Sequence, residues 1–285
     1  MKATISRALI VASVAALAVH SAGAQSMPDR ATVLRAAADA LGMVRWSDIG
    51  AGTTRLPAID VVNTMEFQGN ATTESAGRAL KTQYRVALGY NPPAMRVEMT
   101  REGSNGGAPQ HTIQTVRETY AWDESEIGAG LVPGKGTATP AVAALKERLL
   151  QLWTLPYGVV KGGLAAGEKT AVSTEGGATV ITFPLSGQLA GITVRATLDS
   201  NNFVTKVETR PDNPALASLA TQTEYSNYAD RAEVLTDIKS PGRIIRRQGS
   251  RTLLDMEVKT WETNNLYLVF PVPPNVKTAA AANSR

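Results

Sequence analysis

From Ile59 onward, apolar and polar residues alternate along the chain, and this period of two is the pattern that most restricts the fold. Met95, Val97 and Met99, for example, alternate with Arg96, Glu98 and Thr100, which predicts a strand with one buried face. Turn residues such as Asn91-Pro92-Pro93 separate the runs. Further strands are predicted over 112–122, 179–183, 192–198, 203–209, 221–228, 243–248 and 253–261. The succession indicates a mainly β fold built on an antiparallel meander.

Two segments have the helical period instead. Residues Asp29–Leu41 place apolar side chains on one face, and Gly42 is a suitable C-terminal stop. A second helix is predicted from Thr139, as N-cap, with Pro140 in the first turn and an apolar face that ends before Pro156. We therefore expect an α+β, mainly β fold: a curved antiparallel sheet, or half-barrel, with an N-terminal helix and an inserted covering helix.

The first residues have the three parts of a secretory signal peptide. Lys2 and Arg7 precede an uncharged run, Ala8–Val19, which is shorter than the roughly 20 residues of a membrane-spanning helix. Ala22-Gly23-Ala24 supplies the small residues that signal peptidase requires. We predict a signal peptide over residues 1–24, one half-barrel domain over 25–277, and a disordered tail over 278–285. The mature protein is then periplasmic or secreted, without a membrane span.

Charge and cysteine content exclude several kinds of function. The formal net charge is +4, or +2 without Lys2 and Arg7, which is too small for a nucleic-acid-binding protein. The densest basic group is predicted to form a solvated surface; it comprises Arg243, Arg246, Arg247 and Arg251. There is no cysteine, which excludes disulfides, thiolate nucleophiles and cysteine-based metal sites.

Catalytic patterns are scarce, so an enzyme is not the favoured hypothesis and no cofactor is expected. Of the two histidines, only His111 lies outside the predicted signal peptide, and G-x-S-x-G does not occur. The run Gly128–Gly136 approaches a phosphate-binding loop but lacks its first glycine and its hydroxyl residue. The alternative of an enzyme with a non-histidine, non-metal site would use Asp123, Glu118, Arg117 and Lys161.

The order of elements, a signal peptide, a helix and a long meander with an inserted helix, resembles the incomplete β-barrels of periplasmic lipoprotein carriers and sorting-factor-like domains. The resemblance implies an acyl chain bound inside the half-barrel. Short motifs also resemble the non-catalytic N-terminal region of exported metallo-β-lactamase-fold hydrolases. They include Pro93–Met99, Tyr120-Ala121-Trp122, Leu152-Trp153 with Pro156-Tyr157-Gly158, Asp212-Asn213-Pro214 and Phe270–Pro273. The histidine-rich motif of those hydrolases does not occur, so the second resemblance implies an accessory or binding domain.

Large apolar side chains gather in the first half of the predicted sheet and in the covering helix. They form either ordinary core or the walls of a ligand cavity, and the second hypothesis assigns five of them to ligand binding: Met95, Met99, Trp122, Trp153 and Tyr157. The expected ligand is an apolar or amphipathic small molecule or a lipid. The alternative is an interaction domain that docks a partner protein, such as a separately encoded hydrolase.

Overall fold

The computed structural model describes residues 29–49, 54–58, 62–75, 77–103, 107–230 and 237–283. The predicted signal peptide lies outside these residues.

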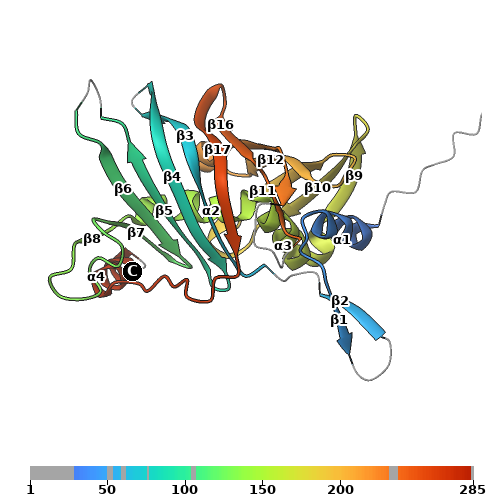
Figure 1. Ribbon diagram of the computed structural model, residues 1–285, viewed down its shortest axis with the longest axis horizontal. Coiled ribbons are helices and arrows are strands. Elements are labelled where there is room, and N and C mark those ends of the chain that lie inside the picture. The colour runs from blue at the N-terminus through green and yellow to red at the C-terminus, as the bar shows by residue number, and fades with distance from the viewer. Residues whose placement is uncertain are drawn as a thin grey trace, which may run out of the picture.

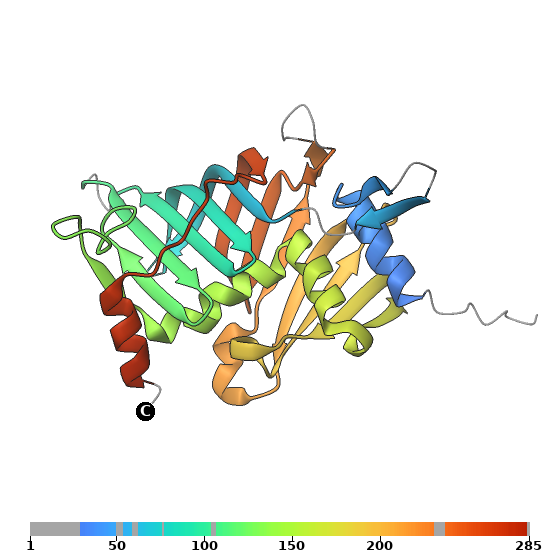
Figure 2. The ribbon, with the colours of Figure 1, turned by 90° about the horizontal axis from the view of Figure 1, so that it is seen from below.

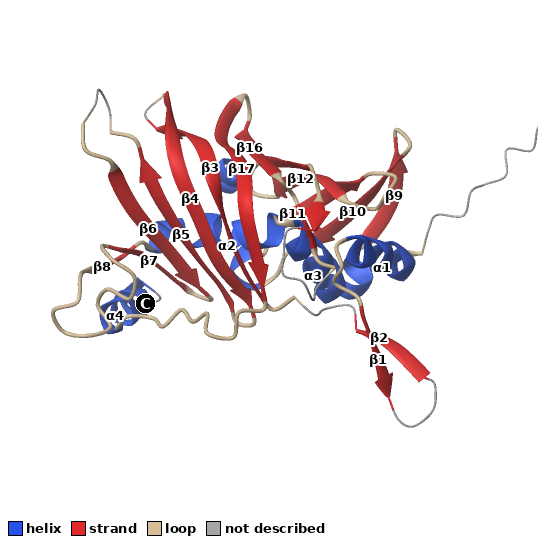
Figure 3. Cartoon of the chain, viewed as in Figure 1, coloured by secondary structure: helices blue, strands red, loops and turns tan. Residues whose placement is uncertain are grey.

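One large antiparallel sheet organises the molecule, and it is curved and unclosed (Figures 1 and 3). Its thirteen strands have the order β8-β7-β6-β5-β4-β3-β17-β16-β13-β12-β11-β10-β9. The strands are β3 (Thr64–Ser75), β4 (Arg78–Tyr90), β5 (Pro93–Arg101), β6 (Gln110–Arg117), β7 (Tyr120–Glu124), β8 (Ala138–Pro140), β9 (Ala171–Glu175), β10 (Ala178–Pro184), β11 (Ile192–Leu198), β12 (Val204–Pro211), β13 (Gln222–Ser226), β16 (Arg243–Gln248) and β17 (Arg251–Thr263). Two small hairpins lie beside it, β1 (Arg45–Ile49) with β2 (Thr54–Ala58) and β14 (Ala229–Asp230) with β15 (Lys239–Ser240). The predicted mainly β half-barrel is confirmed.

Three helices lie against one face of this sheet, which we call the inner face; the opposite one is the outer face (Figure 2). They are α1 (Arg30–Ala40), α2 (Leu145–Thr154) and α3 (Pro156–Ala166). The predicted N-terminal helix and its stop at Gly42, which has a φ of 72°, are confirmed. Asp29 is its N-cap and accepts the Thr32 backbone N–H. Short 3₁₀ turns cover Val142–Ala144, Gly167–Lys169, Gly187–Leu189 and Pro214–Leu219.

The boundaries of the covering helix differ from the sequence prediction. Thr139 and Pro140 belong to β8, the edge strand paired with β7, and α2 begins only at Leu145. Pro140 is tolerated there because an edge strand leaves some backbone N–H groups unpaired. Pro156 begins a further helix, α3, that the sequence analysis missed.

Two other expectations are corrected. The predicted strand Thr112–Trp122 is a hairpin of β6 and β7, because Glu118 takes a φ of 50° and reverses the chain. Most of the tail predicted to be disordered belongs to α4 (Pro274–Asn283), whose Val276 is buried.

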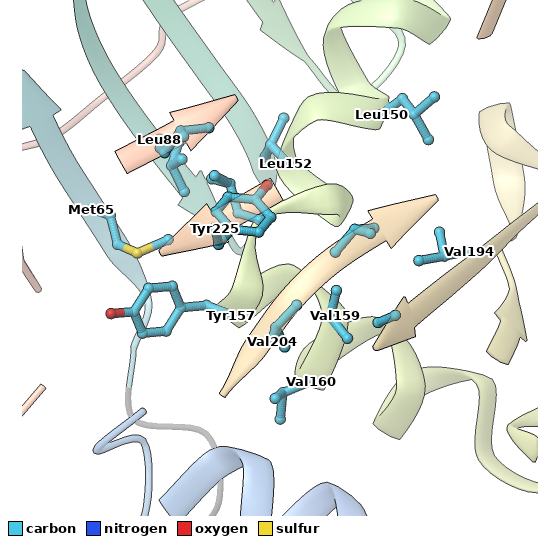
Figure 4. Packing of buried hydrophobic residues seen from close by; sticks show 14 of the residues in the cluster. Met65, Leu88, Leu150, Leu152, Tyr157, Val159, Val160, Val194, Val204 and Tyr225 are labelled. Carbon is cyan, nitrogen blue, oxygen red and sulfur yellow. The ribbon is translucent and has the colours of Figure 1, made fainter. Parts of the chain in front are cut away.

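The core lies between the inner face and α2 and α3 (Figure 4). Figure 4 shows Met65 and Leu88 from the sheet together with Leu152 and Tyr157 from the helices. Trp261 stacks on Phe67, with 4.5 Å between ring centroids, and so joins β17 to β3 within this core.

A smaller apolar layer lies on the outer face. The segment after β17 crosses β4 to β7 there and ends in α4 (Figure 2). Phe270 packs on Ala87 and Ala94, and Val276 packs on Trp122 and Ala138.

Candidate functional site

A small pocket between α2 and the middle of the inner face is the candidate ligand site. Its volume is ≈ 40 Å³, which leaves room for only a few water-sized groups. One part of its wall is apolar and is formed by Phe67, Val86, Met95, Leu155, Ile244 and Leu254. The rest is polar and is formed by Tyr84, Gln151, Thr154, Thr223, Tyr225 and Arg246. An apolar pocket with a few convergent polar groups is the usual composition of a small-molecule site.

Helix α2 closes this pocket, and a buried arginine holds its first half. Arg148 Nη1 donates to the carbonyl oxygens of Trp122, at 2.7 Å, and Thr115, at 3.2 Å. Its Nη2 donates to Asp123 Oδ1 at 2.6 Å. These bonds attach α2 to β6 and β7.

Two tyrosines of the sheet hold the other end of α2. The Tyr90 hydroxyl donates to the Leu152 carbonyl at 3.2 Å, and the Tyr225 hydroxyl donates to the Thr154 carbonyl at 2.7 Å. The Leu152 carbonyl also accepts the Leu155 backbone N–H at 3.4 Å. The Thr154 carbonyl is the last of the helix and has no partner within it, so the Tyr225 hydroxyl satisfies a group that burial would otherwise leave unpaired. Burial also raises the pKa of Tyr225, which keeps its hydroxyl protonated as a donor.

Positive charge lies at the polar side of the pocket. Burial raises the pKa of Tyr84, and the guanidinium groups of Arg246 and Arg101 oppose that rise because both lie near its hydroxyl. Arg101 donates to Thr73 Oγ1 at 3.3 Å and to Met99 Sδ at 3.1 Å. Arg246 Nε is buried and has no hydrogen-bond partner.

The structure brings only some of the five predicted wall residues to this pocket. Met95 lines it, and Met99 lies buried on the next part of the inner face, paired in register with Tyr84. Trp153 packs at 5.8 Å from the Tyr90 ring and lines a separate hollow of ≈ 230 Å³ with α3 and the 3₁₀ turn at 187–189. Tyr157 is fully buried in the core, where its hydroxyl donates to the Lys239 carbonyl at 2.5 Å.

Trp122 lies on the outer face, which corrects the expectation that it lines the inner cavity. It pairs in register with Thr115, and Thr115 pairs with Arg96. Since paired residues share a face, Trp122 lies opposite to Met95. Its Nε1 donates at 2.9 Å to buried Glu124, which also accepts from Thr115 Oγ1 at 2.8 Å.

The residues named for a non-histidine catalytic site lie at separate places. Arg117 pairs with neighbouring Glu118 at 3.3 Å on the β6–β7 turn, and Asp123 pairs with Arg148. Lys161 is buried in α3 with its Nζ 4.8 Å from the centre of the Tyr90 ring. His111 is exposed on β6.

Other features of the described residues give no competing site. No group of three His, Asp or Glu side chains among them could hold a metal ion. No helix in the ranges given above is long and apolar enough to cross a membrane. A hollow of ≈ 890 Å³ lies on the outer face, but polar side chains such as Asn70, Lys81 and Asp255 form its walls.

The sequence analysis missed the polar residues of the pocket. The sequence predicts a solvated surface for Arg243, Arg246 and Arg247, whereas the structure turns Arg246 to the inner face. The alternation in this strand could have predicted this position. Arg246 lies two residues after apolar Ile244, and residues two apart in a strand point to the same face.

No protein-family model matches the chain, and no curated protein matches its sequence. Among solved structures, the chain is similar to an outer membrane lipoprotein-sorting protein domain from Vibrio parahaemolyticus. The TM-score is 0.45 and the identity 10%, over 90% of this chain and 99% of the other. It is also similar to a DUF1329 family protein from Desulfovibrio piger, with a TM-score of 0.44 and 6% identity, over 74% of this chain and 89% of the other. The first is a lipoprotein-sorting domain, the class of protein that the order of elements resembles.

Proposed function

We propose that this protein is an exported, carrier-like binding module that holds one apolar or amphipathic ligand between α2 and the inner face. The main support for this proposal is the combination of apolar and polar side chains that line the pocket. Six apolar side chains from the sheet and from the end of α2 surround a space that has polar groups on one side. Export follows from the signal-peptide pattern at the N-terminus.

The ligand requires more space than the closed pocket has. Pockets for small ligands commonly occupy about 300–1,000 Å³, against ≈ 40 Å³ here. We propose that α2 shifts away from the sheet when the ligand enters. The hydroxyls of Tyr90 and Tyr225 and the guanidinium of Arg148 limit the shift, because they hold both ends of the helix.

A polarity-sensitive apolar dye tests the proposal. We expect the full chain to bind it with a stoichiometry near one, as measured by fluorescence titration and native mass spectrometry. Met95→Phe fills the pocket and is expected to weaken binding about tenfold or more, since it displaces the ligand from its wall.

Met65→Phe is the matched control. Met65 is a fully buried methionine of the same face that does not line the pocket, so the same overpacking destabilises the fold without blocking the site. Thermal unfolding of both variants separates the two effects. Absence of dye binding to the native chain, or equal binding by the two variants, contradicts the proposal.

A second candidate function is the docking of a partner protein, which one observation favours. Leu266 and Tyr267 are each 91% exposed, and Val269 is 65% exposed, in the segment between β17 and α4. A run of exposed apolar residues is common at protein interfaces. A partner that co-purifies with the native chain from its host, and is lost with Tyr267→Ser, would favour docking over ligand storage.

A further inference from the structure

Several arginines of the outer face contact a carboxylate, whereas two arginines beside the pocket do not. On the outer face, five arginines each contact a carboxylate: Arg85, Arg195, Arg243, Arg247 and Arg251. On the inner face, neither Arg101 nor Arg246 has a carboxylate of the described residues within salt-bridge distance. Both of these guanidinium groups lie beside the pocket.

The position of Arg246 follows from strand register. It pairs with Thr223 on β13 and with Leu254 on β17, and all three side chains line the pocket. Its neighbour Arg247 points to the outer face, because successive side chains of a strand alternate, and donates to Glu224 Oε1 at 2.6 Å. The strand therefore directs one arginine to a carboxylate and its neighbour to an apolar wall.

An unpaired guanidinium beside apolar side chains is unfavourable, because burial removes water from the charge without providing a counter-ion. Arg246 Nε shows this directly, since it is buried and makes no hydrogen bond. Glu147 of α2 lies close enough to contribute to the raised pKa of Tyr84, but it is exposed, and no salt bridge of the described residues joins it to Arg101 or Arg246. Neither Arg101 nor Arg246 therefore has a counter-ion of the described residues within salt-bridge distance.

We propose that the ligand is a single-chain amphiphile with an anionic head, which binds between Arg246 and Arg101 while its apolar chain enters the pocket under α2. The inference rests on the proposed function and adds the chemistry of the ligand. A guanidinium binds carboxylate and phosphate groups through two parallel hydrogen bonds, and the Tyr84 hydroxyl adds a neutral donor. The wall formed by Phe67, Val86 and Met95 receives the first part of the chain.

The test compares three ligands of equal chain length: a fatty carboxylate, an alkyl phosphate and the neutral alcohol. We expect at least one anionic ligand to bind about tenfold or more tightly than the alcohol, since a hydrogen bond to a charged group contributes about 1.5–3 kcal/mol. The tighter of the two anions identifies the head group. Affinities are measured by displacement of the dye used above.

Arg246→Met and Arg243→Met form the matched pair of variants. Both keep the apolar stem and remove one positive charge from β16, on the inner and the outer face respectively. Arg246→Met should remove most of the preference for the anion over the alcohol, whereas Arg243→Met should leave both affinities unchanged. Arg246→Lys keeps the charge and should retain part of the preference.

The outcomes separate this inference from the proposed function. If the alcohol binds as tightly as both anions, or if Arg246→Met leaves the preference intact, the anionic head is refuted while a ligand-holding function stands. If none of the three ligands binds, the proposed function itself fails. A melting temperature of Arg246→Met at or above that of the native protein shows that a loss of affinity is not a loss of folding.

Discussion

Arg148 provides the sharpest test of how α2 is held on the sheet. Its side chain is 7% exposed, and it joins the helix to the carbonyl oxygens of Thr115 and Trp122 and to the carboxylate of Asp123. Replacement by methionine keeps the length of the apolar stem and removes all of its donors. The carbonyls then remain buried next to a methyl group.

The magnitude follows from the number and burial of these bonds. A hydrogen bond from a charged donor contributes about 1.5–3 kcal/mol, so the two carbonyl bonds together predict a loss of about 3–6 kcal/mol in the free energy of unfolding. The Asp123 carboxylate is 51% exposed, so its own contribution should be only about 0.5–1 kcal/mol. Asp123→Asn isolates that smaller part.

Urea unfolding followed by circular dichroism measures both variants. We expect Arg148→Met to be several times more destabilising than Asp123→Asn. A loss of less than about 1 kcal/mol for Arg148→Met, or an equal loss for Asp123→Asn, would contradict this role of Arg148. Either result would mean that contacts other than this side chain hold the helix.

Two further predictions concern the outer face. Arg243 hydrogen-bonds Asp255 and lowers its pKa from the usual 3.8, so the pair stabilises the fold above that pH and the contribution is lost as the pH falls through the lowered value. The melting temperature of Asp255→Asn should therefore fall less than that of the native protein between about pH 7 and pH 3; an equal fall in both would contradict the assignment. Phe270→Ala should lower the free energy of unfolding by about 3 kcal/mol, because it removes the ring that packs on Ala87 and Ala94 and leaves a cavity there. Its control, Tyr267→Ala at a 91% exposed position of the same segment, should stay within about 0.5 kcal/mol, and similar losses would show that this segment is not packed as described.

The meander and the first helix could be predicted because local signals agree with the fold there. In β11, for example, apolar and polar residues alternate, and the structure buries every second side chain accordingly. Asp29 and Gly42 lie at the two ends of α1. The hairpin loop at Asp199–Asn202 also has the expected turn residues, and Asp199 Oδ1 accepts the Phe203 backbone N–H at 2.9 Å.

Helix α3 could not be predicted because its glycines oppose helix propensity while its packing requires them. A Cβ at Gly158 would lie 2.1 Å from the Leu152 carbonyl oxygen, and one at Gly162 would lie 2.5 Å from the Phe183 ring. At Gly163 it would lie 2.8 Å from Leu34 of α1. These close approaches depend on tertiary contacts, which outweigh a propensity cost of about 1 kcal/mol per glycine.

The face on which Trp122 lies was also beyond sequence reasoning. The turn at Glu118 sets the register between β6 and β7, and a shift of one residue would exchange the two faces. Met95 was assigned to the inner face correctly because the alternation in β5 is long and regular. Of the residues that form the pocket or hold α2, the sequence indicated Met95. It did not indicate Arg246, or Tyr90 and Tyr225, which bind the end of α2.

The pairing of β3 with β17 has a kinetic consequence. These strands occupy the middle of the sheet, yet Asn63 and Asn264, which hydrogen-bond beside them, are 201 residues apart. Contacts between distant parts of a chain slow folding, because a long loop must close before they form. The two halves of the sheet can therefore join only after the last strand has been synthesised. For a protein that we propose is exported, this delay favours translocation, since the unfinished chain stays open until nearly all of it is available.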